Sequence, residues 1–214
     1  MDDYRGLYRR TFETLGRNLN PEDATPEAEI LAAEKRLGRQ IPKALADFYR
    51  VAGRADDYNA IHDRLLPPTE LALESDKLVF LEENQAVVLW GTDAWPKTTE
   101  DPPAYQATNA EPLIWEAVND RCSVFLLVML HWAAAFAGAM PQTRTSAVDE
   151  RLREALDRDW AYVGEVNGLQ AYNRPSKAVC FLRWDAEWRI FAGSVSGEAM
   201  EAIAADLGVA WELP

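Results

Sequence analysis

The stretch AYVGEVNGLQAYNRPSKAVCFLRWDAEWRIFAGSV, residues 161–195, consists of short apolar runs separated by tight-turn signals. Asn167-Gly168 is a dipeptide typical of two-residue β-hairpin turns, and it separates the first two runs. Asp185-Ala186-Glu187 separates two more, Val179–Trp184 and Trp188–Val195. Strands joined by connections this short run antiparallel, so the stretch predicts consecutive hairpins and excludes crossover helices between these strands.

Helices are expected on both sides of these hairpins. Val148–Leu156 has a helical pattern, and Ser196 can cap a last helix that Gly208 ends. The polar residues 141–148 are expected to form a linker. Before them, Cys122–Met140 is almost wholly apolar, but its second half is rich in Ala and Gly, and this favours a buried core helix over a membrane-spanning one.

The N-terminal half predicts helices followed by strands. Residues 1–20 have a weak amphipathic pattern, and two further helices are bounded by Pro26 and Gly38 and by Pro42 and Gly53. Short apolar runs then predict three strands, at residues 78–81, 86–90 and 113–116. We therefore expect an α+β fold: a mixed, largely antiparallel β-sheet flanked by N-terminal helices and a closing apolar helix, with a C-terminal hairpin and helix extension.

The formal net charge of −13 is concentrated in the middle of the chain. Residues 55–120 contain 3 basic and 14 acidic side chains, whereas residues 1–54 have a net charge of +1 and residues 121–214 a net charge of −3. Such a surplus repels phosphate backbones and attracts basic proteins, so we expect a protein partner and no direct nucleic-acid binding. Solubility alone is the simpler interpretation of the overall charge, but not of its concentration in one segment.

The remaining composition indicates a cytoplasmic protein. The two cysteines, Cys122 and Cys180, are far apart and predict buried thiols in a reducing compartment. No apolar stretch follows the N-terminal Met1, so we expect no signal peptide, and we expect no membrane association. The oligomeric state stays open.

We found no sequence signature of catalysis, and we expect no enzymatic activity, cofactor or metal. His62 lies in an acidic loop and is expected to be solvated, whereas His131 lies in the apolar helix and is expected to be a hydrogen-bonded core residue. Metalloprotease, nucleotide-binding and nucleophile-elbow motifs are absent from the sequence. Carboxylate pairs such as Glu82-Glu83 and Glu100-Asp101 leave a carboxylate-based hydrolase as a distant alternative.

The segment from Glu82 to Glu116 combines carboxylates, amides and aromatic side chains. Aromatic anchors among acids suit an interface with a basic protein. The alternative, core tryptophans beside a solvated acidic loop, explains the composition equally well. The candidate partner-binding residues are Glu82, Glu83, Asn84, Gln85, Asp93, Trp95, Glu100, Asp101 and Tyr105.

Five short motifs follow one another in a fixed order over residues 25–139. They are Ala33–Leu45 with Phe48, Tyr49 and Gly53; Leu66-Pro67-Pro68-Thr69-Glu70-Leu71; Phe80–Gly91, which includes Glu82-Glu83-Asn84-Gln85; Asp101-Pro102-Pro103-Ala104-Tyr105; and Trp115 with Phe125–Trp132. In this order they resemble the SUKH superfamily, the Smi/Knr group, over a little over half of the chain. The resemblance places a family-like core at residues 23–140, a helical segment at 1–22 and an extension at 141–214.

The resemblance also implies a function. Many bacterial members are immunity proteins that bind and neutralise toxins of polymorphic or contact-dependent systems, often nucleases with basic clefts. The chain is thus expected to neutralise a basic toxin domain through its acidic surface. The alternative is a regulatory or scaffold module without a toxin, as in some eukaryotic members. Whether Glu83, Asn84 and Gln85 serve the fold or binding stays open.

Overall fold

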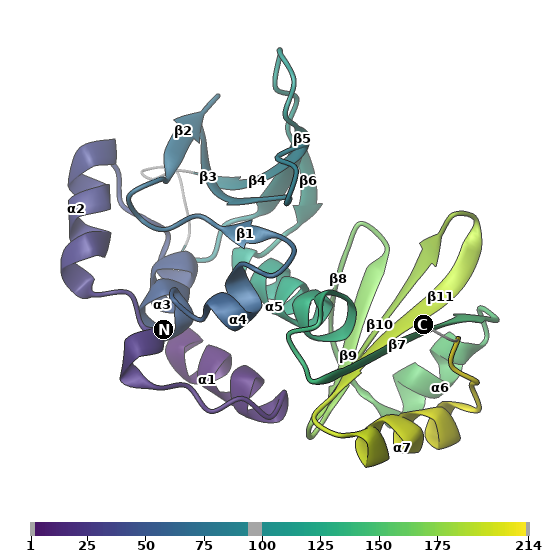
Figure 1. The fold of residues 1–214 in the computed structure, drawn as a ribbon. Coiled ribbons are helices and arrows are strands. Elements are labelled where there is room, and N and C mark those ends of the chain that lie inside the picture. The colour runs from purple at the N-terminus through teal and green to yellow at the C-terminus, as the bar shows by residue number, and fades with distance from the viewer. Residues whose placement is uncertain (1–2, 94–99, 213–214) are drawn as a thin grey trace. The chain divides into compact units, whose positions relative to one another are not determined.

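The computed structural model describes residues 3–93 and 100–212, which form two compact units (Figure 1). Unit 1 comprises residues 1–9 and 19–125, and unit 2 comprises residues 10–18 and 126–214. The division therefore falls within two helices, α1 (Tyr4–Thr14) and α5 (Cys122–Trp132). The boundary expected after residue 140 lies inside unit 2.

Two helices of unit 1, α2 (Glu27–Leu37) and α3 (Lys43–Ala52), begin and end where the sequence predicted. The short α4 (Asp56–Asn59) and a 3₁₀ turn at Pro21–Asp23 were not predicted. Gly38 ends α2 in the left-handed conformation, with φ of 61°, which a residue without Cβ adopts readily. Tyr8 of α1 packs edge-on against Phe48 of α3, with ring centroids 5.1 Å apart.

The sheet of unit 1 is antiparallel throughout and has the order β1-β3-β4-β5-β6, with β2 also paired to β3. Its strands are β1 (Arg64–Leu65), β2 (Ala72–Glu74), β3 (Lys77–Glu82), β4 (Val88–Asp93), β5 (Ala104–Thr108) and β6 (Glu116–Asn119). Phe125 of α5 contacts Phe80 and Trp90, and α5 thereby covers one face. The first two predicted strands are confirmed as β3 and β4. The third lies at β6 and not at residues 113–116, and β5 was not predicted.

The sheet of unit 2 has the order β7-β11-β10-β9-β8, again antiparallel. Its strands are β7 (Gln142–Val148), β8 (Ala161–Val166), β9 (Leu169–Arg174), β10 (Lys177–Trp184) and β11 (Glu187–Ser194). The hairpin at Asn167-Gly168 is confirmed, and both residues have the positive φ that a type I′ turn requires, 48° and 80°. The linker expected at residues 141–148 was wrong, because this segment is β7, paired with β11 along its whole length.

Both faces of the second sheet are covered. On one face, α6 (Leu152–Asp159) and α7 (Gly197–Leu207) enclose a core that includes Phe181, Ile190 and Ile203 (Figure 1). On the other face, the chain continues α5 into a π-helical turn, Ala133–Ala137, which packs against β7, β10 and β11. The π-helical turn lies close to β11 at Gly193, where a Cβ atom would overlap the carbonyl group of Ala134.

The α+β fold class is thus confirmed, with two antiparallel sheets where one had been expected. Cys122 and Cys180 are buried free thiols, as predicted, and burial raises the pKa of each.

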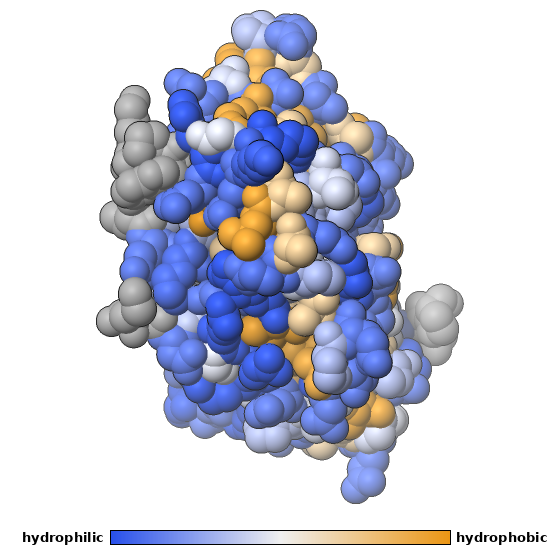
Figure 2. Space-filling view, turned by 90° about the vertical axis from the view of Figure 1, so that its left-hand side faces the viewer, coloured by the Kyte–Doolittle hydropathy of each residue, from blue (hydrophilic) through white to orange (hydrophobic). Residues whose placement is uncertain are grey.

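Within residues 3–93 and 100–212, no helix has both the length and the apolarity needed to cross a bilayer. The side of the molecule on which α2 lies is largely hydrophilic, and its apolar residues form small separate groups (Figure 2).

Candidate functional site

The predicted partner-binding residues lie at two opposite ends of the sheet in unit 1. Glu82 is opposite Leu89 at the β3–β4 hairpin end, whereas Asp93 is opposite Lys77 at the far end. The five residue steps from Lys77 to Glu82 span roughly 16 Å at the rise of a β-strand. Trp95 lies outside the residues that the structure describes. The structure therefore does not bring the predicted set together in one place.

At the hairpin end, most of the predicted side chains already have intramolecular partners. Glu82 forms an ion pair with Arg64, at 2.7 Å between Oε1 and Nη2. Glu83 Oε2 accepts hydrogen bonds from the backbone N–H groups of Gln85 and Val87, at 2.9 and 3.4 Å. Asn84 Nδ2 lies 3.1 Å from His62 Nδ1. The carboxylate of Glu83 thus serves the turn, which is the fold-related alternative for that residue.

The hairpin end also contains Asp63, a carboxyl group with a raised pKa. Burial of this carboxyl group raises its pKa to about 6, and the nearby charge of Glu83 acts in the same direction while His62 opposes it. Asp63 directly precedes Arg64, the first residue of β1, which pairs with Glu82 of β3. The hairpin end therefore combines a carboxyl group that titrates near pH 6 with an imidazole.

The far end is held by a second set of internal contacts. Asp93 forms an ion pair with Lys77 and accepts a hydrogen bond from the Tyr105 hydroxyl at 3.0 Å. The Lys77 ammonium lies 3.7 Å from the centroid of the Tyr105 ring. Burial raises the pKa of Tyr105, and the hydrogen bond to Asp93 raises it further. Asp93 and Tyr105 are therefore parts of one contact network.

Asp101 and Glu100 differ although they are adjacent. The Asp101 side chain is only 8% exposed and pairs with Arg121 at 2.8 Å. It also accepts hydrogen bonds from the backbone N–H and the hydroxyl of Ser123, at 2.8 and 2.6 Å, and so stabilises the first turn of α5. Glu100 is exposed, and its backbone carbonyl accepts the N–H of Ala44. Asp101 serves the fold, whereas the Glu100 carboxylate is open to solvent.

Another set of acids in unit 1 is available to a partner. Within the described part of residues 70–120, these acids are exposed and form no ion pair with any residue that the structure describes: Glu74, Asp76, Glu100, Glu111, Glu116 and Asp120. We call them the open acids. Of this set the sequence had singled out only Glu100, because a sequence does not reveal which acids have a cation nearby in space.

Within the described part of the chain, no three His, Cys, Asp or Glu side chains come together as a metal ion would require. His131 is fully buried, as predicted. Its Nδ1 lies 2.7 Å from the carbonyl oxygen of Leu127, so Nδ1 carries the proton, and Nε2 lies 3.0 Å from Asn173 Nδ2, which donates to it. Burial lowers the pKa of His131 to about 4. The neutral imidazole is a hydrogen-bonded core group.

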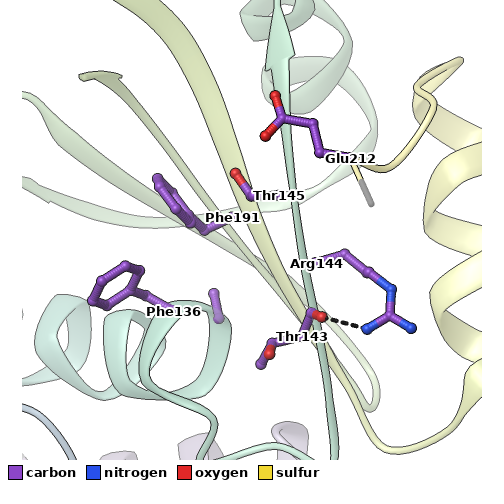
Figure 3. Close-up of a pocket in the computed structure, with 7 residues that line it drawn as sticks. Phe136, Thr143, Arg144, Thr145, Phe191 and Glu212 are labelled. Carbon is purple, nitrogen blue, oxygen red and sulfur yellow. Dashed lines mark hydrogen bonds between the residues drawn. The ribbon is translucent and has the colours of Figure 1, made fainter. Parts of the chain in front are cut away.

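Unit 2 contains a surface hollow that the sequence did not predict (Figure 3). We call it the β7 pocket; it has a volume of about 220 Å³ and is lined by Ala135, Phe136, Thr143, Arg144, Thr145, Phe191 and Glu212. Phe136 comes from the π-helical turn, the threonines come from β7, and Phe191 comes from β11. One signal could have pointed to it: Trp132 and Phe136 are four residues apart on a helical segment, so their rings share one face.

Comparison of this chain with protein-family models, with curated proteins and with solved structures gives no match.

Proposed function

We propose that this protein is an immunity protein that binds and neutralises a basic toxin domain through the acidic surface of unit 1. The proposal rests on the ordered motifs at residues 25–139, which resemble the SUKH superfamily, and on the charge of residues 55–120. A regulatory or scaffold module that binds a basic protein without a toxin shares the same surface chemistry, and the experiment below separates the two.

The observation that carries the proposal is the set of open acids. Residues 55–120 contain 14 acidic side chains and 3 basic ones. Two of those basic residues, Arg64 and Lys77, already form ion pairs with Glu70, Glu82 and Asp93. The open acids therefore keep their charge unbalanced at the surface. An isolated surface charge contributes little to affinity, but several charges of one sign steer a basic partner and raise its association rate.

The contacts in unit 1 also revise which residues should bind. Glu82, Asp93 and Asp101 are paired with cations, and a partner would have to displace those cations to use them. Asn84 and Gln85 are exposed at the hairpin turn and can still offer amide groups to a partner. The proposed interface therefore runs the length of the sheet, from Glu74, Asp76 and Asp120 near the Lys77–Asp93 pair to Glu111 and this turn at the other end.

The test is co-expression with the polypeptide encoded beside this one, with growth as the readout and complex formation as the check. A neighbour that kills cells alone and is silenced in a stable complex supports immunity. A neighbour that binds without being toxic supports the regulatory module. A neighbour that neither binds nor kills contradicts the immunity proposal.

A matched pair of charge-reversal variants then locates the surface. Glu74→Lys/Glu111→Lys/Glu116→Lys and Glu150→Lys/Glu154→Lys/Glu201→Lys change the net charge equally, the first in unit 1 and the second in unit 2. At low salt we expect the first to slow association with the toxin domain about tenfold and the second less than about threefold, with the gap closing as salt rises. Equal slowing by both variants, or an association rate independent of salt, would show that the surface is misassigned.

A further inference from the structure

Two residues that line the β7 pocket, Phe136 and Phe191, belong to a cluster of four aromatic rings. Phe136 and Phe191 meet edge to face with centroids 5.3 Å apart. Trp184 packs against both, at 5.9 and 5.7 Å, and Trp132 stacks on Phe136 at 4.2 Å. Trp184 is nevertheless 41% exposed. A cluster of this kind offers ring edges and faces to an aromatic ligand at the surface.

The pocket lies beside β7, which is the edge strand of its sheet. Thr145 is opposite Phe191 in the strand register, and Thr143 is opposite Gly193. Gly193 lets the carbonyl group of Ala134 approach β11 closely, and the pocket lies between β7 and the residues Ala135 and Phe136 of the π-helical turn (Figure 3). The Thr145 hydroxyl donates to the carbonyl of Ile190 at 2.9 Å, which holds its side chain in place. The pocket is thus preformed by the strand pairing.

Arg144 lines the pocket from β7, and Figure 3 shows its side chain on the side of the strand away from Phe136 and Phe191, so a ligand that contacts all three crosses the open edge of β7. The Glu212 carboxylate is engaged on both oxygens, by Arg189 and by the backbone N–H of Ala147 at 3.0 Å. Arg144 forms no ion pair with any residue in the described ranges. One of its N–H groups donates to the Thr143 carbonyl at 2.7 Å, and a guanidinium has five N–H groups in all. Arg144 can therefore still bind an anionic group.

The size of the pocket restricts the ligand to one small ring system. An apolar cavity of roughly 150 Å³ holds benzene, and pockets for drug-sized ligands begin at about 300 Å³. The 220 Å³ of the β7 pocket therefore suits one aromatic ring with a short substituent. The phenylalanine rings favour an aromatic group, and Arg144, which has no acidic partner in the described ranges, favours an anionic one. A carboxylate matches the planar fork of an arginine.

We propose that the β7 pocket is a binding site for a small aromatic carboxylate. The ring lies against Phe136 and Phe191, and the carboxylate accepts hydrogen bonds from Arg144. This site is independent of the proposed immunity function: it lies in unit 2, its charge has the opposite sign to that of the open acids, and its test needs no protein partner.

The test is ¹⁹F NMR on the full-length protein labelled with 5-fluorotryptophan. Trp184 contacts both pocket phenylalanines, and its resonance is assigned with Trp184→Phe. Phenylacetate, 3-phenylpropionate and indole-3-acetate are titrated, with 3-phenylpropionamide as the neutral counterpart of the second. We expect a saturable shift of the Trp184 resonance with at least one of the acids, and about tenfold weaker binding of the amide than of its acid.

Two arginine variants complete the test. Arg144→Ala should weaken binding of the carboxylate about tenfold and leave the amide unaffected. Arg151→Ala removes an equal charge from an exposed position of unit 2 that does not line the pocket, and it should change binding less than twofold. The other tryptophan resonances report whether each variant keeps its fold. No saturable shift with any of the three acids, equal binding of acid and amide, or equal effects of the two variants would overturn the proposal.

Discussion

One buried titratable side chain in each unit shows a different way of burying a polar group. In unit 1 the most buried carboxylate, that of Asp47, is surrounded by Arg5, Lys43 and Arg50, all within 3.2 Å. In unit 2 the buried group is the neutral imidazole of His131, held by an amide and a carbonyl. A carboxylate neutralised by cations keeps its charge on folding, whereas a buried imidazole must give up its proton. The two units should therefore lose stability to acid in different pH ranges.

The largest effect is expected at His131. Its pKa is lowered to about 4 in the folded protein, against about 6.5 when unfolded, so between these values the unfolded state binds more protons. Folding stability should fall by about 3 kcal/mol as the pH drops through this range. The measurement is the free energy of unfolding against pH for wild type and His131→Gln. Glutamine does not titrate, so the unfolding free energy of the variant should not fall over this pH range, even if the variant is more or less stable than wild type. Identical slopes would contradict the assignment.

A smaller effect is expected at Asp47. Burial acts to raise the pKa of this carboxyl group, but hydrogen bonds from Lys43 and Arg5 outweigh it, and the pKa is lowered. Its contribution to stability is complete above the unfolded pKa near 4 and is lost as the pH falls through the folded value. Because its partners are partly exposed, we expect Asp47→Asn to cost about 2 kcal/mol at neutral pH.

Glu74→Gln is the control for Asp47→Asn, since Glu74 is exposed and belongs to the open acids. We expect it to change the free energy of unfolding by less than about 0.5 kcal/mol. Urea denaturation at pH 7 measures both variants. Similar losses for the two would mean that the acids of unit 1 do not divide into those that hold the fold and those left for a partner.

The sequence predicted the second sheet better than the first, for local reasons. Asn167-Gly168 and Asp185-Ala186 lie in two-residue turns with positive φ, and residues adjacent in sequence specify such turns. β5 reads Ala-Tyr-Gln-Ala-Thr, in which only Tyr105 and Thr108 favour a strand, and it pairs with β4 and β6 on both sides. β7 is polar because it forms the edge of its sheet, and an edge strand can pair without an apolar pattern.

The sequence did not show which acids of the candidate site are paired, because their partners are distant along the chain. The segment that contains Asp93 and Asp101 could be recognised as acidic, but their partners Lys77 and Arg121 lie 16 and 20 residues away. The β7 pocket combines side chains from residue 135 to residue 212. Composition identifies the types of group in a segment, whereas pairing across strands decides which of them remain open to a ligand.

The smallest expected effect, at Asp63, has the opposite sign to that at His131. Its pKa is raised to about 6 by burial, so between pH 4 and 6 the folded state binds more protons than the unfolded state. Stability from this group is therefore present at low pH and is lost as the pH rises through 6. Asp63→Asn removes the penalty of the buried charge, and we expect it to stabilise the protein at pH 7 by about 1 kcal/mol, a value reduced for solvent screening.

Asp63 and His131 titrate over overlapping pH ranges, and they change the folding stability in opposite directions. In the wild-type protein the two effects therefore partly cancel. Asp63→Asn should steepen the loss of stability between pH 6.5 and 4, and His131→Gln should reverse it. The double variant should be nearly flat across this range, because the two groups lie in different units and their effects should add. A double variant that retains either slope would mean that another group titrates there, and the contrast between a charged and a neutral interior would then fail.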